Sequence, residues 1–308
     1  MSSNDPASPT RVSRDPKPDP GERQPLDMRL DAGLYVVSTP IGNLRDVTLR
    51  ALDTLSAADE ILAEDTRTAR KLLDAHGISG KVTPYHDHNG AQRRPELLER
   101  LADGAAIALI SDAGTPLVSD PGFKLVREVA AEGIRVVPVP GASALLAGLV
   151  MAGLPSDRFL FAGFLPPKSG ARCKALAELA DVPATLVFYE TGPRLAAALS
   201  DMSEILGPAR EACVARELTK LFEEARRASL AELVAHYEEV GAPKGEIVVL
   251  IGPPEASEVG EADLDAALIE ALASLPTKQA ANQVAEALGI PKREAYQRAL
   301  ALKADGAG

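Results

Sequence analysis

Several features that would assign the chain to a common protein class are missing from its 308 residues. There are two cysteines, Cys173 and Cys213, and no Cys-x-x-Cys pair, so we expect neither a disulfide framework nor a cysteine metal cluster. No apolar run has the length of a transmembrane helix. The N-terminus also lacks the apolar segment of a secretory signal. These absences favour a soluble protein of the reducing cytoplasm.

Motifs for nucleotide and metal binding are missing as well. No Gly-x-x-x-x-Gly-Lys-Ser/Thr loop is present, which argues against a P-loop kinase or NTPase. No Gly-x-Gly-x-x-Gly follows the first expected strand, and no Cys/His cluster has zinc spacing, so we expect neither a dinucleotide site nor a metal. The net charge of −11 argues against a protein that coats nucleic acid, but it is compatible with a local basic patch.

The fold prediction starts from residues 107–116. Apolar residues run directly into the sequence SDAGTP at 111–116, which indicates a buried strand that ends in a tight loop. Asp120 and Pro121 are expected to open the next helix, as its N-cap and first helical residue. Ligands of open α/β sheets bind beyond the carboxyl ends of the strands, so this loop is the first candidate site.

Alternating strand and helix patterns divide the chain into four regions. Residues 1–32 form a proline-rich tail that we expect to be disordered. Residues 33–153 and 154–254 predict two α/β domains with parallel or mixed sheets. Residues 255–308 have Ala and Leu at helical spacing, and a Gly-Ile-Pro turn divides them, which predicts a helix-turn-helix-like extension.

Three loops that contain Gly and Pro follow expected strands of the first domain, at 39–43, 112–116 and 140–143. Such loops let backbone groups approach a ligand closely. A single loop of this kind would be explained by the need to turn the chain. Three of them at the same edge of one sheet favour a shared ligand cleft.

Six short motifs occur in a fixed order along the chain. They are TPIGNL at 39–44, AEDTR at 63–67, SDAGTPLVSDP at 111–121, PSDRF at 155–159, FYE at 188–190 and ARELTK at 215–220. Together they resemble the bacterial small-subunit rRNA 2′-O-ribose methyltransferases of the tetrapyrrole (corrin/porphyrin) methylase superfamily. The resemblance runs from about residue 34 to 251 and includes the C-terminal tail. Superfamily members that act on porphyrinoids have a Gly-rich, acidic loop after the first strand, which differs from the loop at 39–43 here.

The resemblance implies two α/β domains with S-adenosylmethionine in the cleft between them. It also implies methylation of the 2′-hydroxyl of cytidine 1402 in 16S rRNA of the 30S subunit, and a homodimer. The backbone of 114–116 and the turn at 140–143 resemble the family's cofactor contacts, whereas Asp112 is expected to brace its own loop by accepting backbone N–H groups. The expected cofactor-binding residues are Pro40, Gly42, Asp112, Ala113, Gly114, Thr115, Pro116, Gly141, Ser143 and Tyr189.

A ribose hydroxyl is a poor nucleophile until its proton is removed, so a general base is expected. Glu190, at the end of an expected buried strand, is the first candidate. The alternative role for Glu190 is an ion pair with Arg194 or Arg216. His88 and Glu217 are the next candidates for the base. His88 lies in the polar segment 87–89, which we expect to be a loop that contacts RNA, before a helix that begins at residue 94.

RNA is held at its phosphates by Lys and Arg. One basic cluster is expected on a loop near residue 170. The other is the tail from 276 to 303, where five cations face two carboxylates; its alternative interpretation is a solvated helical hairpin. The expected RNA-binding residues are Arg67, Asn89, Lys168, Arg172, Lys174, Arg216, Lys220, Lys292 and Arg293.

Two other functions remain open at this point. A small-molecule methyltransferase acting on a tetrapyrrole would have a porphyrinoid-sized pocket and no use for the basic tail. A non-catalytic RNA-binding or ribosome-assembly factor would keep the fold without transferring a methyl group.

Overall fold

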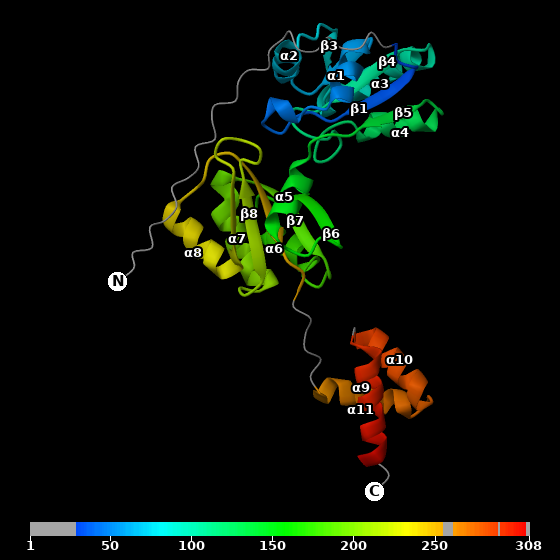
Figure 1. Ribbon diagram of the computed structural model, residues 1–308, viewed down its shortest axis with the longest axis vertical. Coiled ribbons are helices and arrows are strands. Elements are labelled where there is room, and N and C mark those ends of the chain that lie inside the picture. Colours follow the sequence, from blue (N-terminus) through cyan, green and yellow to red (C-terminus); the bar gives the residue numbers. More distant parts are fainter. Residues whose placement is uncertain (1–28, 255–260, 289, 306–308) are drawn as a thin grey trace. The chain divides into compact units, whose positions relative to one another are not determined.

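The computed structural model describes residues 29–254, 261–288 and 290–305, and the chain divides into two compact units between Pro253 and Pro254 (Figure 1). The first unit contains two α/β halves, and the second contains the C-terminal helices. The expected disordered tail lies, up to residue 28, outside the described residues.

The first half is built on a five-stranded sheet with the order β3-β2-β4-β1-β5. All its strand pairs are parallel, as the sequence predicts. Strands β2 and β4 are buried at every residue, which explains why residues 61–63 and 106–110 are all apolar. The strands are β1 (Gly33–Val37), β2 (Glu60–Ala63), β3 (Val82–Pro84), β4 (Ala106–Ile110) and β5 (Val136–Val139).

Helices cover both faces of this sheet, because alternate residues of each strand point to opposite sides. Tyr35 and Val37 of β1 pack with α1 and α2, whereas Leu34 packs with α3 and α4. The helical segments are η1 (Leu44–Asp46), α1 (Leu49–Ala57), α2 (Thr66–Ala75), α3 (Asp87–Ala102) and α4 (Phe123–Ala131).

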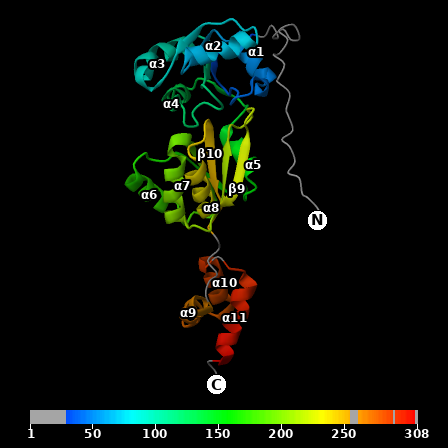
Figure 2. The same cartoon turned by 90° about the vertical axis from the view of Figure 1, so that its left-hand side faces the viewer.

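The second half has a mixed five-stranded sheet with the order β6-β7-β10-β8-β9, in which only β6 and β7 pair in parallel. Figure 2 shows α5 (Ala144–Ala152) on one side of this sheet and α7 and α8 on the other. The strands are β6 (Phe159–Phe164), β7 (Thr185–Thr191), β8 (Glu211–Arg216), β9 (Glu224–Ser229) and β10 (Glu246–Ile251), and the helices are α6 (Ser169–Ala177), α7 (Gly192–Leu206) and α8 (Leu230–Val240).

Helix α5 (Ala144–Ala152) packs on the second sheet. Leu149 shares an apolar cluster with Val248 and Leu250 of β10. Gly148 lies so close to β10 that a Cβ there would be 3.1 Å from Val248 Cγ1. The sequence-based boundary between residues 153 and 154 would leave α5 with the first sheet, so we propose a boundary between β5 and α5 instead.

Two helix starts differ from the sequence prediction. Helix α4 begins at Phe123 and its N-cap is Gly122, so Asp120 and Pro121 lie in the preceding loop. A Cβ on Gly122 would lie 2.8 Å from Leu109 Cδ2, which is why the chain turns into the helix at a glycine. Helix α3 begins at residue 87, so the segment 87–89 is its first turn and not a loop.

The second unit is a three-helix assembly of α9 (Glu261–Leu272), α10 (Thr277–Leu288) and α11 (Lys292–Asp305). Its core is apolar and includes Leu268, Ala281 and Ala299. Arg298 of α11 forms a bidentate ion pair with Asp265 of α9, at 2.5 and 2.6 Å. Helices α10 and α11 confirm the predicted helix-turn-helix-like extension. Arg298, one of the five cations of the tail, is paired within this unit.

Candidate active site

A cleft of about 330 Å³ lies between the two halves of the first unit. Loops that follow β2 and β4 form one wall, and β7, β10 and the start of α5 form the other. Six of the ten expected cofactor-binding residues line it: Asp112, Ala113, Gly114, Thr115, Ser143 and Tyr189. Pro40 and Gly42 line a neighbouring pocket, and Pro116 and Gly141 line neither of these two cavities.

Hydrogen bonds join the three Gly- and Pro-containing loops to one another. Gly114 donates its N–H to the carbonyl oxygen of Thr39 (3.1 Å) and accepts from the N–H of Thr39 (2.8 Å). The hydroxyl of Thr115 donates to the carbonyl oxygen of Ala142 (3.2 Å). The N–H and carbonyl oxygen of Gly114, whose φ is +82, therefore connect two loops, and the residue also lines the cleft. Residue 141 must be a glycine because the loops pack closely there: a Cβ on it would lie 2.9 Å from Ser38 Cβ.

Asp112 connects two loops and does not brace its own. Its Oδ1 accepts a hydrogen bond from the backbone N–H of Asp65, which follows β2, at 3.0 Å. Asp65 in turn caps α2, and hydrogen bonds from Arg67 lower the pKa of Asp65 to about 2. This chain of contacts fixes the position of α2 relative to the cleft, and it engages the expected RNA-binding residue Arg67.

The cleft is lined by carboxylates. They are Glu64, Asp112, Asp120, Glu190 and Glu246, and no Lys, Arg or His occurs among the described residues that line it. Burial, followed by the charge of Asp112, raises the pKa of Glu64. Burial, followed by the charge of Glu64, raises the pKa of Asp120 to about 6. A site of this kind attracts cations and hydrogen-bond donors.

Glu190 is 3% exposed and forms the ion pair with Arg194 that the sequence analysis named as its alternative role. Its Oε1 accepts from the N–H of Thr191 at 2.7 Å and lies 3.3 Å from Nε of Arg194. Its Oε2 is buried and has no hydrogen-bond partner among the described residues. Arg216 pairs with Glu224 instead (2.8 Å). The ion pair with Arg194 therefore holds one oxygen of Glu190 and leaves the other available.

The structure does not support the other two candidates for the base. His88 is exposed in the first turn of α3 and does not line the cleft. Glu217 is 3.0 Å from Lys220 Nζ, and the hydrogen bond from Lys220 lowers the pKa of Glu217, which makes it a weaker base.

Tyr189 links the wall of the cleft to α5. Its hydroxyl oxygen accepts from the backbone N–H of Leu145 at 3.2 Å, and its ring packs edge-on against Phe161 and Phe164. Burial raises the pKa of Tyr189, so its hydroxyl stays protonated at neutral pH.

The expected RNA-binding residues divide into free and engaged side chains. Arg172 is buried and pairs with Asp201 at 2.6 Å, so its expected role at a phosphate is wrong. Lys220 pairs with Glu217 and Glu246, and Asn89 accepts from the N–H of His86 within the capping of α3. Four of the expected residues are exposed cations that form no ion pair with a described residue: Lys168, Lys174, Lys292 and Arg293.

Sequence reasoning missed several residues of the cleft, above all Glu64 and Asp120. Both lie in loops that follow the carboxyl ends of parallel strands, where ligands of such sheets bind, and this position is the signal that could have identified them.

Among the described residues, no group of three or more His, Cys, Asp or Glu side chains could hold a metal ion. No helix in this part of the chain is long and apolar enough to cross a membrane.

Comparisons with known proteins agree with this architecture. Residues 33–234 match the family model of the Tetrapyrrole (Corrin/Porphyrin) Methylases, and residues 258–303 match the RsmI C-terminal HTH domain. A relative from Mesorhizobium japonicum, "Ribosomal RNA small subunit methyltransferase I", is 53% identical over 274 residues, which cover 89% of this chain and 93% of the relative. The protein of the same name from Escherichia coli O157:H7 is 47% identical, and the match covers 87% and 94% of the two chains.

Solved structures show the same fold at low sequence identity. Uroporphyrin-III-C-methyltransferase from Thermus thermophilus is 22% identical with a TM-score of 0.52, covering 72% of this chain and 94% of the other. Another structure of that enzyme, complexed with S-adenyl homocysteine, has a TM-score of 0.50 at 22% identity and covers 71% and 96%. The extent of the family match and of the identity to these relatives shows that the chain belongs to the tetrapyrrole (corrin/porphyrin) methylase family.

Proposed function

We propose that this chain is a cytoplasmic S-adenosylmethionine-dependent methyltransferase of small-subunit rRNA, acting on the 2′-hydroxyl of cytidine 1402 in 16S rRNA. The observation that carries the proposal is the buried Oε2 of Glu190, which has no hydrogen-bond partner in the described part of the chain, in an acidic cleft between the two halves. The names of the relatives support rRNA of the small subunit as the substrate. The family motifs of the sequence support the ribose hydroxyl as the acceptor.

The residues of the cleft fit S-adenosylmethionine. Its sulfonium and ammonium groups are cations, and five carboxylates line the cleft. Apolar side chains, including Ile41, Phe164 and Leu218, offer a surface for the adenosine. The volume of about 330 Å³ lies at the lower end of the usual range for ligand pockets, roughly 300–1,000 Å³. When bound, S-adenosylmethionine would supply an electrophilic methyl group.

The chain's own part in the reaction is to position the acceptor hydroxyl and to remove its proton. As the oxygen of the ribose gains a carbon substituent, its O–H bond must break, and Oε2 of Glu190 is available to take the proton. The N–H of Thr191 and the guanidinium of Arg194 fix the other oxygen of the carboxylate. Glu190 is thus held in one orientation, and positioning of this kind contributes much of the rate acceleration.

Binding of the RNA is assigned to exposed cations outside the acidic cleft. Lys168 and Lys174 lie at α6, and Lys292 and Arg293 begin α11. The match of residues 258–303 to a helix-turn-helix domain supports a role of the second unit in nucleic-acid binding. We also propose a homodimer, which sedimentation of the purified protein would test.

The test is transfer of tritiated methyl groups from S-adenosylmethionine to 30S subunits, with naked 16S rRNA and a porphyrinogen as the other acceptors. We expect label in 16S rRNA, and resistance of the bond after cytidine 1402 to alkaline cleavage, because a 2′-O-methyl group blocks that cleavage. Label in the porphyrinogen alone would support the tetrapyrrole enzyme. No transfer to any acceptor, with RNA binding retained, would support the non-catalytic factor.

A further inference from the structure

A second pocket, of about 260 Å³, adjoins the acidic cleft. Four residues line both cavities: Ile41, Asp112, Ala113 and Glu246. The rest of the second pocket is formed by the loop after β1, by Thr68, Lys71 and Leu72 of α2, and by Lys220. A group bound in this pocket therefore lies next to a group in the cleft, at the residues that the two cavities share.

The charge of the second pocket differs from that of the cleft. Two lysines, Lys71 and Lys220, are among its lining residues. The ammonium of Lys220 is held by Glu217 and Glu246, at 3.0 and 2.8 Å. Lys71 is exposed and forms no ion pair with a described residue, so its charge is available at the mouth of the pocket.

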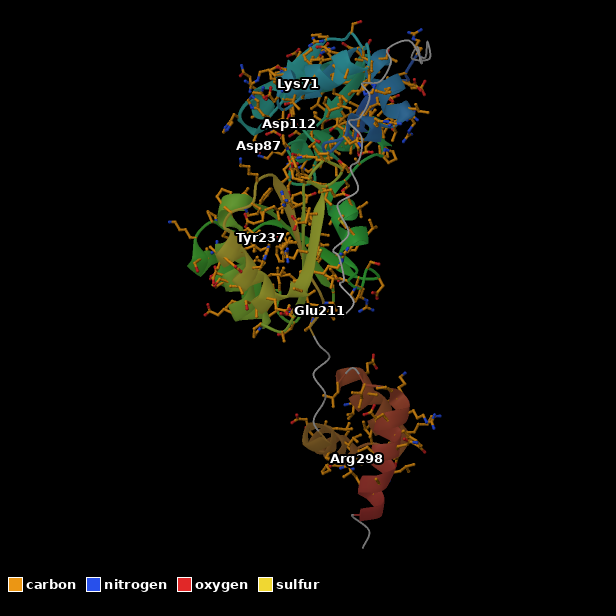
Figure 3. All side chains as sticks on the ribbon, turned by 60° about the vertical axis from the view of Figure 1, so that its left-hand side comes forward. Lys71, Asp87, Asp112, Glu211, Tyr237 and Arg298 are labelled. Carbon is orange, nitrogen blue, oxygen red and sulfur yellow. The ribbon has the colours of Figure 1, made fainter. Side chains whose placement is uncertain are left out.

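The pocket's two carboxylates, Asp112 and Glu246, balance its two lysines, and the exposed side of α2 adds a further cation. Arg70, next to Lys71, is also exposed and forms no ion pair with a described residue. Ala69, Leu72 and Leu73 of the same helix are buried against the first sheet, which fixes residues 70 and 71 on the solvent side. Figure 3 shows Lys71 and Asp112 in the same half of the first unit. The chain as a whole has a net charge of −11. Arg70 and Lys71 beside the second pocket therefore form a local site for an anion.

We infer that the second pocket receives the acceptor nucleotide of an RNA strand, with phosphates at Lys71 and Arg70 and the ribose at the wall shared with the cleft. This inference rests on the proposed function. The phosphates of a polyanionic strand are attracted to the free cations on the face of α2, and its uncharged ribose is the part that lies near Asp112 and Glu246, the carboxylates shared by the two cavities. Enzymes that do chemistry on a base take the nucleotide out of its stack into a pocket. A cavity of about 260 Å³ suits one nucleotide better than a tetrapyrrole.

The first test is Lys71→Ala, with binding of 30S subunits measured over a range of salt concentrations in the absence of cofactor. We expect weaker binding, with the slope of log affinity against log salt reduced by roughly 0.7–0.9, the value for one phosphate that is no longer neutralised. Affinity for S-adenosylmethionine, measured by calorimetry, should not change. Lys124→Ala is the matched control, because Lys124 is an exposed helical lysine of the same half that lines neither cavity.

A second variant, Thr68→Phe, fills the pocket instead of removing charge, since Thr68 lines it from α2. We expect methyl transfer to be abolished while affinity for S-adenosylmethionine is retained. Wild-type binding and salt slope in Lys71→Ala, or loss of cofactor affinity in either variant, would overturn the inference. If the wild-type protein transfers no methyl group to RNA, the proposed function fails, and the binding data for Lys71→Ala still decide whether this face holds RNA.

Discussion

The aliphatic stem of Lys220 lies against the backbone of Gly42, so close that a Cβ on residue 42 would come within 2.5 Å of Lys220 Cγ. Gly42 follows β1 and Lys220 lies between β8 and β9, so this contact joins the two halves of the first unit. This contact explains why residue 42 is a glycine, a residue that the sequence analysis expected to bind the cofactor. Gly42, with φ +151, is required by the packing of Lys220 and by the backbone of its own loop.

Replacement of Gly42 by alanine should therefore destabilise the protein. The added methyl group would displace the stem of Lys220, and overpacking of this kind costs about 1–3 kcal/mol. Urea denaturation would measure the change in the free energy of unfolding. Gly170→Ala is the control, because a Cβ there meets nothing within 4 Å and Gly170 has no positive φ. Equal stability of Gly42→Ala and the wild type would contradict this account of the contact.

Glu190→Gln keeps the shape of the side chain but removes its ability to take a proton. Methyl transfer should slow by about two to four orders of magnitude, the usual contribution of a general base. Affinity for S-adenosylmethionine should change little, because the amide fills the same space and the charge that it removes is already balanced by Arg194. Single-turnover kinetics at saturating cofactor would measure the chemical step. A rate close to that of the wild type would remove Glu190 from the mechanism.

Asp120 should make cofactor affinity depend on pH. Burial and the charge of Glu64 raise the pKa of Asp120 to about 6, so the side chain is neutral below that pH and ionised above it. A cationic ligand favours the ionised form, and its affinity should fall as the pH drops through 6, by at most about tenfold per pH unit. Calorimetry between pH 7.5 and 5 would show this step for the wild type, and Asp120→Asn should lack it.

The same pKa has the opposite consequence for stability. A carboxyl whose folded-state pKa lies above its ordinary value of 3.8 contributes stability at low pH, and this contribution is lost as the pH rises through 6. The stability of Asp120→Asn relative to the wild type should therefore increase between pH 5 and 7.5, as thermal unfolding would show. A constant difference across this range would contradict the raised pKa.

The sequence was informative where local pattern determines structure. Apolar runs such as 107–110 located the buried parallel strands. The Ser-x-x-Glu spacing of Ser229 and Glu232 is likewise typical of a capping box, and the two residues form one at the start of α8. It was uninformative about partners that are distant in the chain. Nothing near Arg172 indicates that Asp201, 29 residues later, makes it a buried structural ion pair. The hydrogen bond from the N–H of Asp65 to Asp112 likewise depends on the order of β2 and β4 in the sheet.

Removal of residues 261–308 separates the role of the second unit from that of the first. The remaining chain should fold, because both sheets and their helices end before residue 252 and the second unit has an apolar core of its own. Affinity for S-adenosylmethionine should be retained, since every residue that lines the cleft is upstream. Binding of 30S subunits should weaken without vanishing, because Lys168 and Lys174 remain.

The salt dependence of binding distinguishes RNA docking from a dimer interface. Each phosphate that Lys292 or Arg293 neutralises in the full chain adds roughly 0.7–0.9 to the slope of log affinity against log salt, so the truncated protein should show a shallower slope. If the helices instead hold two subunits together, the truncated protein should sediment as a monomer with the slope per subunit unchanged. A truncated dimer that methylates 30S subunits with an unaltered KM at all salt concentrations would show that α10 and α11 have no part in RNA binding.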